Sequence, residues 1–478
     1  MIGTGIWQTL GWILLLFAAA LALPIVVALA SGDYGVARAF LPSLALAGFV
    51  GASCVLSLGG GEGLVASRQG AAVVVVSLAV LPPVAALPFL LSGVVPNFVD
   101  AYFEAVSGLT TTGATVLRHL SDVPHAVLFW RALLEWLGGF GAIVFAGAFL
   151  VPLFFPGLPV HQVPLPPAAG EMVQQRLERM AEIVWPVYVV LTIGSWMALW
   201  MSGVDSFEGL CLAMSGIATG GFMPRDGTLA AFGDPWVSPI MAATTLLGAL
   251  NFFQHVHTGR TRELPHLRDG ETQVVVGAAV LGAVLFAASV ARGDPYGLAV
   301  LMSDGFMLAL SSGFSAGSDP LVGLVPTVIV LGTALTGGAM ISTAGGFKLI
   351  RLMVLLRLGA SELARLSHPH RAHAARLAGH TVESRLATSV WSYFFVLLAS
   401  HGILLLTLTG LGMEFEPALT AAVATLTNTG APLVYLQGEH AYAGLGRVAK
   451  LVLCGAMIAG RVEFLALLAV LNPAYWRR

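Results

Sequence analysis

The chain has 478 residues, of which 57% are hydrophobic and only 10% are charged, whereas roughly a quarter of the residues in a soluble domain are charged. This composition excludes an ordinary soluble protein and predicts an integral protein of the lipid bilayer, because each membrane helix needs roughly 20 largely apolar residues. The net charge of -2 and the lack of a basic block argue against nucleic acid as a partner. The three cysteines stand far apart in apolar stretches, so neither a disulfide framework nor a cysteine metal site is expected.

Ten hydrophobic runs follow one another along the chain and predict the membrane spans. They cover residues 8–30, 41–58, 70–92, 124–152, 181–203, 236–256, 273–291, 321–357, 386–411 and 444–471. Between alternate pairs of these runs lie stretches that are too short or too polar to cross a bilayer. The four stretches are near residues 97–120, 205–228, 295–318 and 416–435.

The four intervening stretches share one kind of sequence, which indicates an internal repeat. The first reads DAYFEAVSGLTTTGATVL and the second EGLCLAMSGIATGGFMPR, and a gapless alignment places Gly113 on Gly221. The third and fourth match more weakly, yet each has a short helix-compatible run followed by Ser, Thr or Asn residues and one glycine, Gly313 or Gly430. We therefore expect a unit of span, half-helix, glycine turn and span that occurs four times.

The expected fold class is an all-α polytopic membrane protein with four tandem repeats of helix, re-entrant half-helix loop and helix. Two extra N-terminal helices precede the repeats. The expected divisions are the N-terminal helices at 1–66, pore repeat 1 at 67–156, repeat 2 at 157–262, repeat 3 with an intramembrane loop at 263–360, and repeat 4 with a preceding cytoplasmic segment at 361–478.

The distribution of charge predicts the orientation. Arginines gather at one set of span ends, as at Arg176, Arg260 and Arg365, and positive charge marks the cytoplasmic side. The half-helix loops are then expected to enter from the outside. Acidic residues on that side, among them Glu104 and Asp304, are expected to form a mouth that concentrates cations.

Four re-entrant loops predict a pore, because non-helical backbone at membrane depth persists only where protein covers it or where it lines a water-filled path. A glycine in each loop lets neighbouring carbonyls point at a common axis, and rings of carbonyl and hydroxyl oxygens can replace the hydration shell of a monovalent cation. The alternative is that glycine and threonine only help the helices to pack. The expected ligands of a potassium ion are Thr111, Thr112, Gly113, Thr219, Gly220, Gly221, Ser311, Ser312, Gly313, Asn428, Thr429 and Gly430.

The run 321–357 is longer than one crossing requires, and its middle, LTGGAMISTAGGFK, is unfavourable for a helix. We interpret it as an unwound intramembrane loop below the filter that can obstruct the pore and move; the alternative is a tolerated kink. Lys348 is either a gate charge or an ordinary cytoplasmic anchor. The expected gate residues are Thr336, Gly337, Gly338, Ser342, Thr343, Gly345, Gly346, Lys348 and Arg461.

Two further charged positions lie within spans. Arg461 is near the middle of the last run, where an unpaired charge costs at least a few kcal/mol. It is expected to face the pore and raise the barrier to cations, or else to form a structural pair with Glu463 or another acid. Arg131 and Glu135 are one helical turn apart and are expected to pair and brace the span behind the first loop.

Four segments are distinctive in combination: FEAVSGLTTTGATV at 103–116, RALLEWLGGFGAIV at 131–144, STAGGFKLIR at 342–351 and GRVEFLALL at 460–468. Together they resemble the Trk/Ktr/HKT superfamily of potassium transporters, and specifically its TrkH-type membrane subunits. The resemblance implies a pseudo-fourfold pore with one filter glycine per repeat, the intramembrane loop as gate, and Arg461 below the filter. It also implies a homodimer, a cytosolic nucleotide-binding regulatory subunit of TrkA type, and a preference for potassium over sodium.

The sequence has no nucleotide site, catalytic triad or ATPase motif, so no enzyme activity and no cofactor are expected. The leading hypothesis is a gated potassium uptake pore of a bacterial-type inner membrane, with its filter loops facing outside. One alternative is a proton- or sodium-coupled potassium symporter, for which Glu135, Arg461 and Glu463 are the deep candidates. Another is a purely structural or assembly subunit of the membrane.

Overall fold

The computed structural model describes residues 4–57, 67–150, 173–261, 263, 266, 269–289, 295–317, 325–367, 375–377, 380–438 and 440–472. Within these residues the regular structure is almost entirely helical. The exception is a pair of two-residue antiparallel strands, β1 (Arg376–Leu377) and β2 (His380–Thr381). The expected all-α class is therefore confirmed apart from this short ladder.

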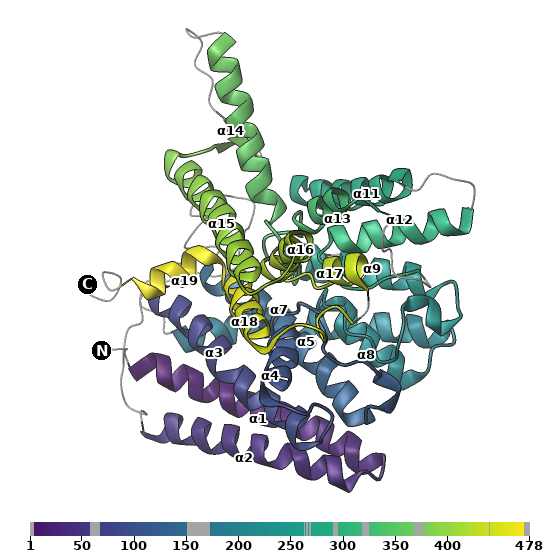
Figure 1. Ribbon diagram of the computed structural model, residues 1–478. Helices are drawn as coiled ribbons and strands as arrows, with labels where there is room; N and C mark the ends of the chain where they lie inside the picture. The colour runs from purple at the N-terminus through teal and green to yellow at the C-terminus, as the bar shows by residue number, and fades with distance from the viewer. Residues whose placement is uncertain are drawn as a thin grey trace.

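Two long apolar helices, α1 (Thr4–Ala30) and α2 (Tyr34–Ser57), form a hairpin at one edge of the molecule (Figure 1). They pack on the first repeat through an aromatic cluster, in which the rings of Phe17 and Phe40 lie 5.5 and 5.9 Å from the ring of Trp130. Trp130 is fully buried, and its indole Nε1 donates a hydrogen bond to a backbone carbonyl at 3.1 Å. This polar contact fixes the orientation of a large apolar side chain, as buried tryptophans generally require.

Four units of long helix, half-helix and following helix come after the hairpin. The leading helices are α3 (Ser67–Leu91), α7 (Val173–Met201), α11 (Gly270–Ser289) and α15 (Ser384–Gly410). The half-helices, 12 to 15 residues long, are α4 (Phe98–Leu109), α8 (Ser206–Ile217), α12 (Pro295–Ala309) and α16 (Phe415–Leu426). The following helices are α5 (His125–Phe145), α9 (Val237–Ala249), α13 (Thr327–Ala334) and α18 (Arg447–Val462). This order agrees with the expected unit, while the repeat boundaries remain a prediction.

Two of the half-helices, α4 and α8, start at residues whose polar side chains cap them. Asn97 accepts a hydrogen bond from Asp100 N at 3.0 Å, and Asp205 accepts one from Phe207 N at 2.9 Å. Such side-chain caps satisfy backbone amides that a helix start leaves free. The residues from Phe103 to the end of α4 are buried. Protein therefore covers the half-helix, as a segment that does not cross the bilayer requires.

Two predicted spans are broken. The run 236–256 was expected to be one span, but α9 and α10 (Phe252–Thr261) meet at 95°. The Asn251 side chain accepts a hydrogen bond from Phe253 N at 3.1 Å and so starts a new helix there. The last run is divided between α18 and α19 (Phe464–Leu471), because Glu463 adopts a left-handed φ of 63°. A hydropathy pattern alone does not reveal either break.

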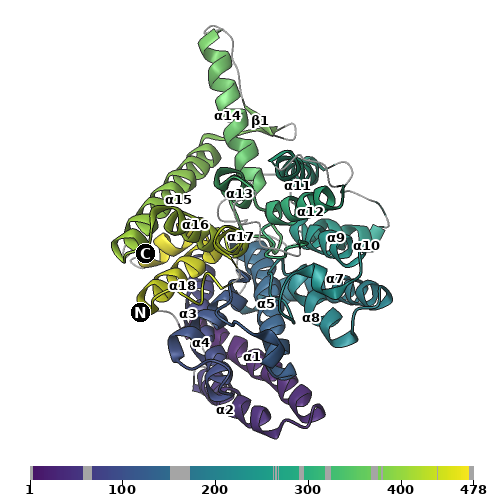
Figure 2. The same ribbon diagram turned by 45° about the vertical axis from the view of Figure 1, so that its right-hand side comes forward.

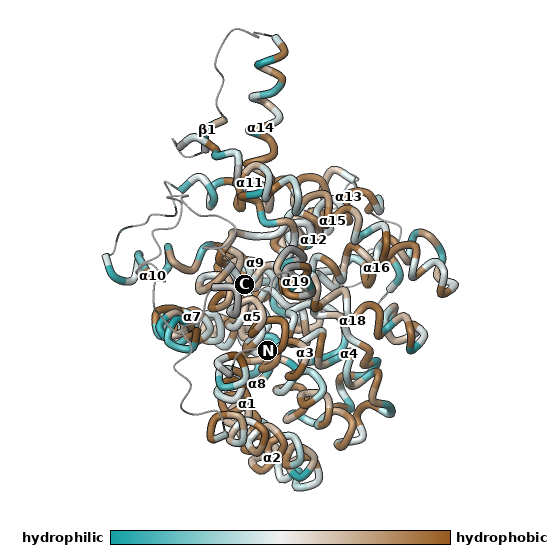
Figure 3. The backbone as a smooth tube through the Cα atoms, turned by 90° about the vertical axis from the view of Figure 1, so that its left-hand side faces the viewer, coloured by the Kyte–Doolittle hydropathy of each residue, from teal (hydrophilic) through white to brown (hydrophobic). Residues whose placement is uncertain are grey.

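Seven helices in the described part of the chain are long and apolar enough to cross a membrane, and the bent pair α9 and α10 makes an eighth. Figure 3 shows apolar residues along most of these helices. The protein is thus a multi-pass membrane protein. Short helical turns connect the longer elements: η1 (Leu120–Asp122), η2 (Ala146–Leu150), η3 (Leu229–Phe232) and α17 (Ala431–Gln437).

One helix, α14 (Leu349–Ser367), projects beyond the rest of the bundle (Figures 1 and 2). Its first turns are buried, whereas near its far end Leu363 and Leu366 are 70% and 82% exposed. The helix begins directly after the non-helical segment 336–348, so its buried end is continuous with the expected gate.

Candidate ion filter and gate

The four half-helices end in the same backbone conformation. The residue two positions before each expected filter glycine has a left-handed φ, at 55°, 51°, 61° and 53° for Thr111, Thr219, Ser311 and Asn428. None of these residues is glycine, so the conformation carries a steric cost at each loop. In each loop, the backbone N–H of the residue after the left-handed one donates a hydrogen bond to a carbonyl near the end of the half-helix. In the first loop this bond runs from Thr112 N to Ser107 O at 2.9 Å. Four segments far apart in sequence thus make one type of turn.

The turns meet one another directly. Gly313 N donates to Gly220 O at 2.8 Å, and Gly430 N donates to Thr112 O at 2.6 Å. The approach is so close that a Cβ atom added to Gly221 would lie 2.5 Å from the Cα atom of Gly313. Glycine is therefore required here by contact between loops. These two hydrogen bonds join the second turn to the third and the first turn to the fourth.

Three hydroxyl groups at the turns lack hydrogen-bond partners within the described part of the chain. The side-chain oxygens of Thr111, Ser311 and Ser312 are buried and have no partner among the described residues. A buried hydroxyl without a partner costs on the order of 1–3 kcal/mol, so native proteins rarely keep one without a reason. Oxygen ligands for a monovalent cation supply such a reason.

A cavity of about 110 Å³ lies beside the turns. Its lining includes the three glycines Gly113, Gly221 and Gly313, followed by Thr115 and Ser315. The expected filter residues of three repeats therefore reach one common space. The fourth loop contacts the first, because Gly430 N donates a hydrogen bond to Thr112 O. The Gly430 carbonyl in turn accepts a hydrogen bond from the Tyr442 hydroxyl at 3.0 Å.

The expected gate loop is non-helical between α13 and α14, as the sequence predicts. Its glycines make close backbone contacts, since a Cβ atom on Gly337 would lie 2.3 Å from Gly345 O and one on Gly338 would lie 2.7 Å from Ala249 O. Gly337 and Gly346 have φ values of 78° and 72°, which glycine adopts without strain. The loop is thus a folded, closely packed structure rather than a simple helix kink.

The gate loop lies against the inner ends of the filter turns. Gly346 N donates to Thr427 O at 2.9 Å, directly before the left-handed Asn428. On the opposite side, the Thr343 hydroxyl donates to Ile217 O at 3.0 Å and lies 3.3 Å from the Thr219 hydroxyl. The loop therefore spans from the second turn to the fourth. Thr336 anchors its beginning through its hydroxyl, which donates to Ala309 O of the third half-helix at 2.9 Å.

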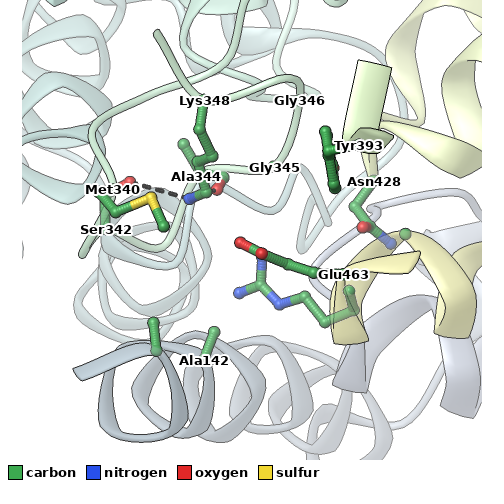
Figure 4. A pocket seen from close by; sticks show the side chains of 13 residues that line it. Ala142, Met340, Ser342, Ala344, Gly345, Gly346, Lys348, Tyr393, Asn428 and Glu463 are labelled. Carbon is green, nitrogen blue, oxygen red and sulfur yellow. Dashed lines mark hydrogen bonds between the residues drawn. The ribbon is translucent and has the colours of Figure 1, made fainter. Parts of the chain in front are cut away.

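Two basic side chains, Arg461 and Lys348, donate hydrogen bonds to the backbone of the gate loop, and Figure 4 shows Lys348 beside Ala344. Arg461 Nη1 donates to Thr343 O at 2.8 Å, and its buried Nε and Nη2 atoms have no partner among the described residues. Lys348 Nζ donates to Ala344 O at 2.5 Å and lies 3.4 Å from the Ser342 hydroxyl. Both side chains line a small cavity of about 30 Å³, which is enough for about one or two water molecules.

The ion pairs differ from those expected. Glu463 pairs with Arg351 at the start of α14, so it is not the partner of Arg461. Arg131 pairs with Glu104, with 2.7 Å between Nε and Oε1, instead of with Glu135 one turn away. The expectation of an Arg131–Glu135 pair was wrong because a half-helix from the same repeat brings a second carboxylate closer than the neighbouring helical turn does.

The acidic outer mouth was also predicted incorrectly in part. Glu104 and Asp304 are fully buried and cannot attract cations from solvent. Other carboxylates are paired: Asp100 with Lys450 at 2.7 Å, and Glu208 with Arg225 at 2.5 Å. These paired acids join neighbouring elements instead of forming a bare negative surface.

Asp226, in the segment between α8 and α9, likewise joins two loops. Its carboxylate in the second loop accepts hydrogen bonds from Leu120 N at 2.6 Å and from Ser121 N at 3.1 Å in the first. Partial burial would raise the pKa of Asp226, but these hydrogen bonds outweigh it and the pKa lies below its ordinary value. The two loops are therefore joined by an ionised carboxylate at neutral pH.

The sequence reasoning missed a buried contact to the gate loop. Glu271 of α11 is 2% exposed and accepts a hydrogen bond from Met340 N at 2.7 Å and one from Asn251 Nδ2 at 3.2 Å. It therefore connects the loop with the break between α9 and α10. An acid next to the apolar run that begins at 273 was the available signal.

Comparisons with known proteins agree with this geometry. Residues 51–262 and 309–476 match the TrkH family, described as a cation transport protein. The chain is 32% identical to the Trk system potassium uptake protein TrkH of Escherichia coli (strain K12) and 30% identical to that of Halomonas elongata, over 99% of each chain. The crystal structure of the potassium transporter TrkH from Vibrio parahaemolyticus matches with a TM-score of 0.88 at 30% identity, covering 99% of both chains.

The family that the motifs predicted is thus confirmed over nearly the whole length of the chain. The match includes the loop that ends α4, the gate loop and the broken last span. This chain belongs to the TrkH family of cation transport proteins.

Proposed function

We propose that the protein is a potassium uptake protein, in which four turns form a filter and the loop 336–348 forms its gate. The observation that carries this proposal is the set of four equivalent left-handed turns, which come from four separate segments and lie in mutual contact. Unpaired buried hydroxyls at Thr111, Ser311 and Ser312 supply oxygen ligands where the turns meet. The named function of the relatives, potassium uptake, supports the choice of ion.

The filter works by replacing water with protein oxygen atoms. A cation that enters from the cavity beside the turns loses its hydration shell to carbonyl and hydroxyl oxygens of the turns. The carbonyl ends of the half-helices carry partial negative charge, which favours a cation over an anion there. The uncharged ligand set also disfavours calcium and magnesium, which prefer carboxylates.

The loop 336–348 closes the pore by direct contact with the filter turns. The hydrogen bonds of Gly346 and Thr343 hold the loop against the second and fourth turns, so no cation passes until these contacts break. Arg461 binds the same loop through Thr343 O, and its positive charge adds a barrier to cations in the closed arrangement. Breaking the contacts would remove both obstacles together.

The remaining features of the assembly are part of the same proposal. The family resemblance implies a homodimer and a cytosolic nucleotide-binding partner of TrkA type. The distribution of basic residues predicts that the filter faces the outside of a bacterial-type inner membrane. The projecting end of α14 is a surface that such a partner could contact. Measuring the mass of the purified protein with and without the partner tests both the homodimer and the complex.

Flux into liposomes tests the filter. Purified protein, with its cytosolic partner added where the protein alone is closed, is assayed with potassium or sodium as the only cation. Gly113 has a φ of 72°, and its added Cβ would lie 2.9 Å from Gly220 O, so Gly113→Ser should reduce the preference for potassium. Gly93→Ser is the matched control, because Gly93 has a φ of 75° and open space around it. Equal ion preference in wild type and Gly113→Ser would refute the proposed filter.

A coupled symporter is the second candidate, and Glu135 is the observation that favours it. This carboxyl group is fully buried and accepts a hydrogen bond from Phe222 N at 3.2 Å, next to the second filter glycine. A buried carboxyl group beside the ion path could carry a coupled proton. The reversal potential separates the candidates: a pure pore reverses at the potassium equilibrium potential, whereas a symporter shifts with the gradient of protons or sodium.

A further inference from the structure

Two fully buried carboxyl groups occupy equivalent positions in repeats 1 and 3. Glu104 precedes Gly113 by nine residues, and Asp304 precedes Gly313 by nine residues. Each lies on its half-helix and is 0% exposed. A buried carboxyl group is costly unless it accepts hydrogen bonds, so its contacts indicate what it does.

Both groups hold the segment that follows the filter glycine. Glu104 accepts a hydrogen bond from Val116 N at 3.0 Å and one from the Thr115 hydroxyl at 2.9 Å. Asp304 accepts one from Ala316 N at 2.5 Å, and the Ser315 hydroxyl lies 3.4 Å from its second oxygen. In each repeat, the amide is three residues after the glycine and the hydroxyl is two residues after it. The half-helix thus fastens the outgoing side of its own filter turn.

Repeats 2 and 4 do not have this arrangement. The residue nine positions before the glycine is Leu212 in repeat 2 and Ala421 in repeat 4, so neither repeat has an acceptor there. Pro224 stands where repeats 1 and 3 have the donating amide, and proline has no N–H to donate. Repeat 2 therefore lacks both the carboxyl acceptor, where it has Leu212, and the amide donor, where it has Pro224. Instead, Glu135 of α5 accepts Phe222 N in the second loop.

The two carboxyl groups differ in their surroundings. Glu104 forms an ion pair with Arg131, which also donates to Met223 O at 3.0 Å. Asp304 has no basic partner among the described residues, and its polar contacts there are those with Ser315 and Ala316. Repeats 2 and 4 also contact the segment that follows Gly313. Leu229 N of repeat 2 donates to Ser315 O at 2.9 Å, and the Tyr435 hydroxyl of repeat 4 donates to Phe314 O at 2.8 Å.

We propose that Asp304 is a positioning residue for ion selection: its carboxyl group, by accepting the Ala316 amide, fixes the place of Gly313 in the filter. The inference rests on the proposed filter and names one residue outside the pore on which its selectivity depends. Gly313 donates to Gly220 O, so a shift of its segment moves the contact between the second and third turns. A small change in cavity size or ligand number alters the balance between potassium and sodium.

The test compares potassium and sodium flux in liposomes for a series of variants at position 304. Asp304→Asn keeps an oxygen that accepts the Ala316 amide, whereas Asp304→Leu keeps a similar volume and removes the acceptor. Losing the hydrogen bond from Ala316 N corresponds to a change of up to about tenfold in an equilibrium ratio. The potassium-to-sodium flux ratio should therefore fall, by up to about tenfold, in Asp304→Leu and stay near the wild-type value in Asp304→Asn. Leu212→Val, at the equivalent position of repeat 2, should leave the ratio unchanged.

Three results would overturn the proposal. They are an unchanged ratio in folded Asp304→Leu, an equal loss in Asp304→Leu and Asp304→Asn, and an equal loss in the Leu212→Val control. If Asp304→Leu does not fold, Asp304→Glu replaces it, since it keeps the charge but moves the oxygen by one methylene. Loss of selectivity in Asp304→Glu with retention in Asp304→Asn supports the positioning role, and the reverse order refutes it.

Gly113→Ser, measured in parallel, separates this inference from the function it rests on. If Gly113→Ser relaxes selectivity and the position 304 variants do not, the filter stands and the role of Asp304 is wrong. If Gly113→Ser has no effect, the location of the filter itself is wrong.

Discussion

Replacing Gly345 by alanine should force the gate loop away from the filter. Gly345 has an ordinary φ, so alanine meets no backbone strain there. Its Cβ atom, however, would lie 1.9 Å from Thr427 O, a distance that real Cβ atoms essentially never show. The loop must therefore move by about 1 Å, because closely packed atoms cannot overlap.

The energy of this movement follows from the contacts that it breaks. The bond from Gly346 N to Thr427 O is adjacent and would be lost, as would the bond from Arg461 Nη1 to Thr343 O if the loop moves as a unit. A neutral hydrogen bond contributes about 1 kcal/mol and one to a charged group about 1.5–3 kcal/mol. Together they shift the equilibrium between closed and open states by roughly 2.5–4 kcal/mol, or about 70-fold to 900-fold.

Potassium flux into liposomes that hold the protein without any cytosolic partner measures this shift. Gly345→Ala should conduct far more than wild type under these conditions. Gly359→Ala in α14 is the control, because nothing lies within 4 Å of its added Cβ atom, and its flux should equal that of wild type. Monodisperse Gly345→Ala protein with wild-type or lower flux would refute the interpretation of the loop as a gate.

Three further substitutions test other contacts. Arg461→Ala should raise basal potassium flux about tenfold, since it removes a charged hydrogen bond to the gate loop, and the same liposome assay measures it. Gly220→Ala should abolish selective transport, because its Cβ atom would lie 2.3 Å from the buried carboxyl carbon of Glu135; wild-type selectivity would contradict the packing. Arg131→Leu should destabilise the protein by about 3–5 kcal/mol, because it leaves a buried carboxylate unpaired, and the added change Glu104→Leu should recover part of the loss of thermal stability.

The positions of the four turns and of the non-helical loop 336–348 were predictable because the signals for them are local. Glycines and hydroxyl residues such as those at Thr112, Gly113 and Gly345 interrupt apolar runs, and each interruption is visible in the sequence. The conformation of the turns was not predictable in this way. Thr111 and Ser311 adopt left-handed φ values that residues with a Cβ atom rarely adopt, so their residue types do not predict the turn.

The side-chain pairings were less predictable, because they depend on which elements pack together. Arg131 could have paired with Glu135 on its own helix, but the folded chain brings it to Glu104. The sequence does contain a signal for the buried acids, namely an acid nine residues before the glycine and a hydroxyl two residues after it in repeats 1 and 3. Only the structure shows that these acids point inward, since burial depends on the three-dimensional neighbours of each half-helix.

The four left-handed turns also determine how the protein can be stabilised by engineering. A left-handed residue with a side chain costs roughly 1–2 kcal/mol relative to glycine, and Thr111, Thr219, Ser311 and Asn428 all adopt this conformation. Glycine at these four places is therefore an obvious choice for a more heat-resistant variant. Each such change would also delete a polar side chain beside the ion path. Thermostability screens should consequently favour variants that have lost ion discrimination, and a screen for this protein should score transport together with melting temperature.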